Sequence, residues 1–158
     1  TDALHTLYLF GVEPDSPEAN RAIAPVHEAA RWEYDSNLRY WEGEVEECIN
    51  GRTVADGAYF GVDVSPIVER LLEGHLPDGG WNCERCNGSL RSSFHSTINV
   101  LEGLLEFERV AGGTARSRAA RRAGEEYLLA RGLFRGLGSG EPAHMEGLHL
   151  QIFIDTEL

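Results

Sequence analysis

An internal repeat of about 50 residues constrains the fold of this chain more than any other feature of its sequence. Residues 9–17 read Leu-Phe-Gly-Val-Glu and then, after two residues, Ser-Pro. Residues 59–66 echo them with Tyr-Phe-Gly-Val-Asp and a second Ser-Pro, and residues 107–114 form a weaker third copy. Periods of this length, built from pairs of helices, are typical of helical repeat arrays.

Each copy contains the signals that end one helix and begin the next. An aromatic residue closes the first helix, and the glycine after it lets the chain leave in a left-handed conformation. Ser16, Ser65 or Thr114 then caps the following helix, and Pro17 or Pro66 stands in its first turn, where a missing N–H is tolerated. The pattern predicts helices over residues 1–10, 17–31, 47–60, 66–74, 93–110 and 114–131.

These helices predict an all-α fold of about three antiparallel hairpins. We expect the hairpins to occupy residues 1–135 and to form an arc, with an irregular tail over residues 136–158. Within the tail, residues 150–154 have a strand-like composition. The long loops at residues 32–46 and 75–92 are rich in Trp, Gly, Asn and charge. Loops of this kind on one edge of a scaffold often carry function.

The repeat also predicts how the helices are layered. We expect the helices that start near Glu47 and Ser93 to be neighbouring inner helices. Those that start near Pro66 and Thr114 should lie outside them. The last of these helices places Arg and Glu four residues apart, which is typical of a solvent-facing surface.

Composition excludes several classes of protein. The formal charge of −12 argues against binding to a nucleic-acid backbone, which requires neutralisation by Lys and Arg. No run of apolar residues is long enough for a transmembrane segment. Three cysteines indicate a reducing cytoplasm rather than a disulfide scaffold. All 14 basic residues are Arg, which we interpret as the codon bias of a GC-rich, bacterial genome.

Two stripes run along the helix expected at residues 93–110. Phe94, Ile98, Leu101 and Leu105 have the spacing of a buried apolar face. The second stripe, about 100° away, is made of His95, Asn99, Glu102 and Glu106. It is either a solvated face or a face that turns His95 toward the mouth of a pocket.

The preceding loop contains the sequence Asp78-Gly79-Gly80-Trp81, which predicts a tight turn. Trp81 would then join neighbouring hairpins through its large apolar surface. The turn resembles the Gln/Trp repeat motif of squalene and oxidosqualene cyclases, although His75 stands where that motif carries Gln. The resemblance implies a prenyltransferase and squalene-cyclase α/α toroid. Three hairpins cannot close such a ring, so we expect either a longer parent chain or self-association.

Two further segments resemble the β subunits of protein prenyltransferases. Residues 92–104 are similar to an inner helix in which Asp-x-Tyr-His-Thr supplies a zinc-binding His, here His95. Asp56-Gly57-Ala58-Tyr59 is similar to an Asp-Gly-Cys-Tyr segment whose Asp and Cys complete that zinc site. Ala58 stands in the place of the cysteine, and the acidic motifs of class II cyclases and of magnesium-dependent enzymes are absent from the sequence.

The resemblance therefore implies Asp56 and His95 as catalytic and metal-binding residues. Cys83 and Cys86 have the spacing of half a zinc site, and they are candidate ligands with His95 and either Cys48 or Asp56. Alternatively, they are thiols of a structural loop, without zinc.

An isoprenoid-type apolar molecule is the expected substrate. The residues expected to contact it are Arg52, Tyr59, Trp41, Trp81 and Phe94, and the rings among them would stabilise cations unless they belong to the core. A catalytically inactive toroid that binds an apolar ligand or a protein partner is the alternative. A third possibility is a glycosidase that uses Glu102 and Glu106.

Overall fold

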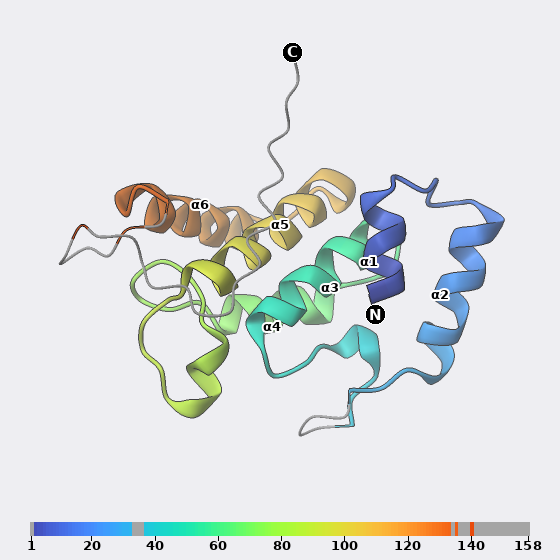
Figure 1. Cartoon of the computed structure of the whole chain (residues 1–158), viewed down its shortest axis with the longest axis horizontal. Coiled ribbons are helices and arrows are strands. Elements are labelled where there is room, and N and C mark those ends of the chain that lie inside the picture. Colours follow the sequence, from blue (N-terminus) through green and yellow to red (C-terminus); the bar gives the residue numbers. More distant parts are fainter. Residues whose placement is uncertain (1, 33–36, 134, 136–139, 141–158) are drawn as a thin grey trace, which may run out of the picture.

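The computed structural model describes residues 2–32, 37–133, 135 and 140. Within these residues the fold is all-α, as predicted (Figure 1). The six α-helices are α1 (Asp2–Leu9), α2 (Pro17–Ala29), α3 (Glu47–Tyr59), α4 (Ser65–Glu73), α5 (Phe94–Ala111) and α6 (Ala115–Ala130). Two 3₁₀ turns, η1 (Tyr40–Glu42) and η2 (Cys83–Asn87), lie in the long loops. The segment with strand-like composition, residues 150–154, lies outside the described residues.

Helix ends follow the repeat with one shift of register. Ser16 caps α2 and Thr114 caps α6, and their hydroxyls accept from backbone N–H groups three residues later at 3.1 and 3.0 Å. Ser65 was expected to cap α4 but is its first residue. The Asp63 carboxylate accepts from the Ser65 N–H instead, at 3.0 Å. Val64 occupies the N-cap position of α4, so no side chain caps this helix.

Helices α1, α3 and α5 run in the same direction, about one repeat apart. His5 and Tyr8 of α1 lie beside Asp56 and Tyr59 of α3, an offset of 51 residues in both pairs. Helix α4 packs on α3 and α6, and α6 packs on α5, so these outer helices form a second layer. The predicted adjacency of the helices at Glu47 and Ser93 is confirmed. No helix in the described ranges is both long and apolar enough to cross a membrane.

The contact between α3 and α5 is set by two glycines. A Cβ atom on Gly103 would overlap the carbonyl oxygen of Gly51, and a Cβ on Gly51 would lie 2.5 Å from the carbonyl oxygen of Asn99. The backbones of the two helices therefore touch. As a result α3 is the central helix, with nine of its thirteen residues buried.

This contact corrects the predicted buried stripe on α5. Ile98 and Leu105 are 54% and 55% exposed, although their spacing suggested a core face. The face that meets α3 instead carries smaller residues, among them Thr97, Val100 and Gly103. Close backbone approach requires small side chains at the contact itself, and the larger Leu104 and Phe107 are buried beside it.

The turn at Asp78-Gly79-Gly80-Trp81 forms as predicted, with Gly79 in a left-handed conformation at φ 102°. Trp81 is fully buried. Its indole N–H donates to the carbonyl of Leu71 in α4 at 2.7 Å, and its backbone N–H donates to the Thr97 hydroxyl in α5 at 3.0 Å. The ring also packs against Gly124 of α6. One side chain thus joins three helices.

We expect Trp81→Ala to lower the free energy of unfolding by about 3–5 kcal/mol, because it removes a fully buried ring. Thermal or urea unfolding measures the change. Leu105→Ala is the control: that side chain is half-exposed, so its loss should change stability by less than about 0.5 kcal/mol. Equal midpoints for the Trp81 variant and the wild type would contradict a core role for the ring.

We expect Gly103→Ala to destabilise the protein by about 1–3 kcal/mol through overpacking against α3. The clash must exceed the gain in helix propensity, which favours Ala by about 1 kcal/mol. Ala111→Ser adds one heavy atom at an exposed position of the same helix and should be nearly neutral. Urea denaturation compares the two, and a stabilised Gly103→Ala variant would show that the helices separate freely.

Candidate functional site

A largely buried, hydrogen-bonded pair of side chains, His5 and Asp56, lies between α1 and α3. The Nδ1 atom of His5 lies 2.8 Å from the Oδ1 atom of Asp56, and Asp56 is only 1% exposed. Both residues lie on faces determined by the repeat, because α1 and α3 are equivalent helices one repeat apart. His5 therefore fixes the orientation of a carboxyl group that has almost no contact with solvent.

Further titratable groups surround this pair. Burial raises the pKa of Asp56, and the hydrogen bond from His5 and the charge of Arg52 oppose that rise. Burial also raises the pKa of Glu102 on α5, and the nearby Asp56 contributes. Burial and the charge of Glu102 raise the pKa of Tyr8 to about 12. For each of these groups the surroundings favour the neutral form over the charged form, although Glu102 is exposed to solvent.

Aromatic rings lie beside the carboxyl groups. Tyr8 and Tyr59 meet edge to face, with ring centroids 5.1 Å apart. Tyr59 also meets Phe60 at 5.0 Å. Glu106, one turn beyond Glu102, is held by Arg109 through two hydrogen bonds of 2.6 and 3.0 Å. We call His5, Tyr8, Asp56, Tyr59 and Glu102 the inner-helix cluster. It combines proton donors and acceptors with π faces.

The structure brings only some of the predicted site residues into this cluster. Asp56 and Tyr59 belong to it, and Arg52 is close enough for its charge to lower the pKa of Asp56. His95 does not pair with Asp56. His95 is exposed in the first turn of α5, which lies beside the start of α3, near Cys48. Asp56 lies eight residues after Cys48, which is about 12 Å further along α3.

The other predicted aromatic contacts lie elsewhere. Trp41 is buried against Gly57, and Trp81 is buried among α4, α5 and α6. Phe94 is half-buried, with its ring 5.8 Å from that of Tyr127. These three rings act as packing groups in the described structure.

Sequence reasoning did not identify His5 and Tyr8. A signal was present, because His5 and Tyr8 precede Asp56 and Tyr59 by 51 residues, close to the repeat length, and have the same spacing. Treating residues 1–10 as an inner helix would have placed these side chains on the same face.

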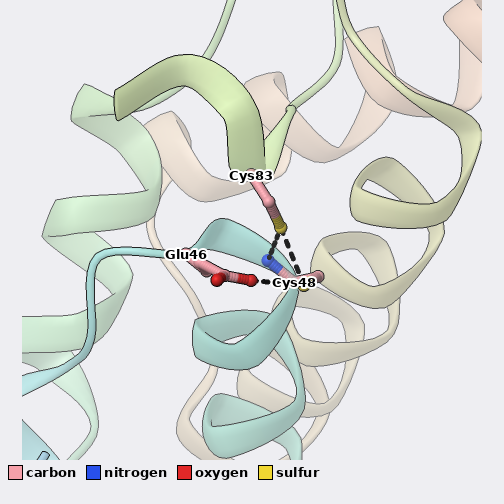
Figure 2. A group of neighbouring side chains, drawn as sticks. All are labelled: Glu46, Cys48 and Cys83. Carbon is pink, nitrogen blue, oxygen red and sulfur yellow. Dashed lines mark hydrogen bonds between the residues drawn. The ribbon is translucent and has the colours of Figure 1, made fainter. Parts of the chain in front are cut away.

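A second cluster lies at the start of α3 and consists of Glu46, Cys48 and Cys83 (Figure 2). The sulfur atoms of Cys48 and Cys83 are 2.7 Å apart, and the Cys48 sulfur lies 3.9 Å from Oε2 of Glu46. The Cys83 sulfur also accepts from the backbone N–H of Cys48 and from the Ser96 hydroxyl, each at 3.2 Å. The contact between the two sulfur atoms lowers the pKa of Cys83 and raises that of Cys48.

The zinc site implied by the resemblance does not fit the residues present. Among the described residues, the group of side chains that could hold a metal ion consists of Glu46, Cys48 and Cys83. Their ligand atoms lie within 4.8 Å of one another. Asp56 and His95 are not in that group, and Ala58 offers no ligand atom. Cys83 belongs to it, whereas Cys86 is exposed and donates to the carbonyl of Cys83 at 3.3 Å.

A small polar pocket of about 140 Å³ adjoins the second cluster. Its walls are Glu44, Val45, Glu47, Asn50, Arg70, Glu73 and Arg85. Arg85 of η2 donates to the buried carboxylate of Glu47 at 2.6 Å, and Asn50 holds the backbone of Glu44 at 2.7 Å. These contacts tie the η2 loop to the beginning of α3. The pocket is too polar to receive an isoprenoid chain.

Comparisons with models of protein families, with curated proteins and with solved structures find no match to this chain. The geometry of the two clusters is therefore the basis for any functional assignment.

The buried Asp56 predicts a pH dependence of stability. Its folded pKa lies above the ordinary value of 3.8, so the folded state binds more protons than the unfolded state between the two values. Wild-type stability should therefore fall relative to Asp56→Asn as pH rises through that interval. Urea unfolding at a series of pH values measures the difference.

Asp63→Asn is a control with the opposite sign. Hydrogen bonds from Ser65 lower the pKa of the exposed Asp63. The wild type should therefore gain stability relative to that variant as pH rises toward the ordinary value. For each variant, the difference from the wild type in free energy of unfolding is plotted against pH. If the two plots had the same slope, the assigned environment of Asp56 would be incorrect.

Proposed function

We propose that this chain is an arc of an α/α toroid that binds an isoprenoid-type apolar molecule against its inner helices. In this proposal it acts in the manner of a terpenoid cyclase or prenyltransferase. The observation that carries the proposal is the buried His5–Asp56 pair, flanked by the rings of Tyr8 and Tyr59. Burial raises the pKa of the Asp56 carboxyl group, which favours its use as a general acid.

The proposed step is proton transfer to a carbon–carbon double bond. The O–H bond of protonated Asp56 breaks, and the π electrons of the alkene form a new C–H bond. A tertiary carbocation and an Asp56 carboxylate result, and His5 holds the carboxylate in place. Loss of a proton from the carbon next to the cation returns the proton to Asp56 and forms a new double bond. The balance is an isomerisation or a cyclisation, and it consumes no other reactant.

The neighbouring side chains have separate roles in this step. The rings of Tyr8 and Tyr59 present π faces that stabilise a cation. Glu102, whose pKa is also raised, contributes little negative charge while it is protonated. Asp56 is covered by His5 and the residues around it, so the side chains of α1 must move aside for a ligand to reach it.

Deuterium incorporation tests the proposal. The purified protein is incubated in D₂O with linear isoprenoid alkenes, and the products are analysed by mass spectrometry. We expect catalytic incorporation of deuterium by the wild type and a loss of at least about 100-fold in Asp56→Asn, as for removal of a general acid. Asp63→Asn removes an exposed carboxylate and should retain full activity.

The alternative, a catalytically inactive toroid that binds an apolar ligand or a protein partner, is favoured by the exposed side chains of Ile98 and Leu105 on α5. Saturable binding of isoprenoids to the wild type and to Asp56→Asn, without deuterium in either, would support a binding protein. The absence of both binding and incorporation would exclude the isoprenoid proposal.

A further inference from the structure

The cluster of Glu46, Cys48 and Cys83 is separate from the inner-helix cluster. It occupies the first turn of α3, whereas Asp56 lies in the last turn of that helix. Its residues come from two parts of the chain, since Cys83 belongs to the η2 loop, 35 residues after Cys48. A ligand held here would connect that loop to the central helix.

The atoms of this cluster are suited to a soft divalent cation. Two sulfurs and one carboxylate oxygen lie within 4.8 Å of one another. Zinc prefers thiolate ligands at about 2.3 Å and accepts carboxylate oxygen at about 2.0–2.2 Å. The two sulfurs are 2.7 Å apart, and they would have to move apart by about 1 Å for one ion to bind both.

The surroundings prepare Cys83 for ligation. Its sulfur accepts from the backbone N–H of Cys48 and from the Ser96 hydroxyl, and both donors remain available when a metal is bound to the sulfur. Hydrogen bonds of this kind around a ligand atom orient it and tune its affinity. The Cys83 backbone N–H also donates to Ser96 at 3.0 Å, which fixes the start of η2 against α5.

Cys86 is the candidate for a fourth ligand, although its sulfur lies outside the group formed by the other three side chains. In a 3₁₀ turn, side chains three residues apart lie on the same edge, so η2 places Cys86 on the edge that carries Cys83. The thiol of Cys86 is exposed and is held by one hydrogen bond to the Cys83 carbonyl. Ligation by Cys86 would require its side chain to leave this hydrogen bond and turn toward the cluster. A Cys-x-x-Cys pair is the usual half of a structural zinc site.

We propose that Glu46, Cys48, Cys83 and Cys86 bind one Zn²⁺ ion that fastens the η2 loop to the start of α3. This site is independent of the proposed isoprenoid chemistry, and it excludes His95 and Asp56 as ligands. A disulfide between Cys48 and Cys83 is the competing chemistry. It would use two of the three thiols and would not involve Glu46 or Cys86, whereas a metal would use all four side chains.

Metal titration of the full chain tests the site. The protein is reduced, freed of metal, and titrated with Zn²⁺ in competition with a chromophoric chelator, and bound metal is counted by elemental analysis. Co²⁺ then replaces Zn²⁺, because its absorption reports both tetrahedral geometry and thiolate ligation. We expect one ion per chain, thiolate-to-cobalt charge-transfer bands, and a rise in melting temperature on metal binding.

Variants identify the ligands. Cys83→Ser should abolish binding, and Cys86→Ser and Glu46→Gln should each weaken it by at least about tenfold. Cys86 is exposed, so its variant should fold normally, which circular dichroism checks if Cys83→Ser is unstable. His95→Ala is the control and should bind zinc with unchanged affinity.

Several outcomes would overturn the proposal. One is binding of less than one zinc ion per chain by the reduced wild type. Another is an unchanged zinc affinity in Cys86→Ser, or a loss of zinc binding in His95→Ala. The last is a Cys48–Cys83 disulfide that forms in the presence of zinc. Deuterium incorporation by Cys86→Ser separates the two proposals. A loss of zinc with retained isoprenoid chemistry would support the metal site as an independent feature.

Discussion

The backbone contact between α3 and α5 is the constraint on which the rest of the structure depends. Gly51 and Gly103 let the two helices approach until their main chains touch. This approach buries α3 on most sides and positions Glu102 near Asp56. It also places η2 and the start of α5 beside the first turn of α3. Both candidate sites therefore rely on a helix contact made by two glycines, which have no side chains.

Sequence reasoning predicted the helices well because their ends are encoded locally. Ser16, Thr114 and the repeat glycines act within one turn of the chain, and the expected helix ends agree with the observed ones to within about two residues. The packed face of α5 was not predictable in this way. Periodicity favoured the stripe through Ile98 and Leu105, whereas the backbone contact at Gly103 buries the face that carries Val100, Leu104 and Phe107.

The candidate sites show the same division between local and tertiary information. Asp56 was identified from its segment, but its partner His5 lies 51 residues away and is brought to it by helix packing. His95 was paired with Asp56 because both stood on inner helices. The two residues lie at different levels along their helices, His95 in the first turn of α5 and Asp56 in the last turn of α3. Cys48 and Cys83 were both named as candidate metal ligands, yet the contribution of Glu46 depends on the path of the chain before α3.

The common direction of α1, α3 and α5 has an electrostatic consequence. Their helix dipoles add, so the partial positive charges of three N-termini collect at one end of the layer and the partial negative charges at the other. Cys83, whose sulfur contacts the Cys48 N–H in the first turn of α3, lies at the end that stabilises anions. Asp56, Tyr59 and Tyr8 lie in last turns, where the exposed carbonyl groups disfavour a carboxylate and attract a cation. The backbone alone therefore prepares one end of this layer for thiolates and the other for positive charge.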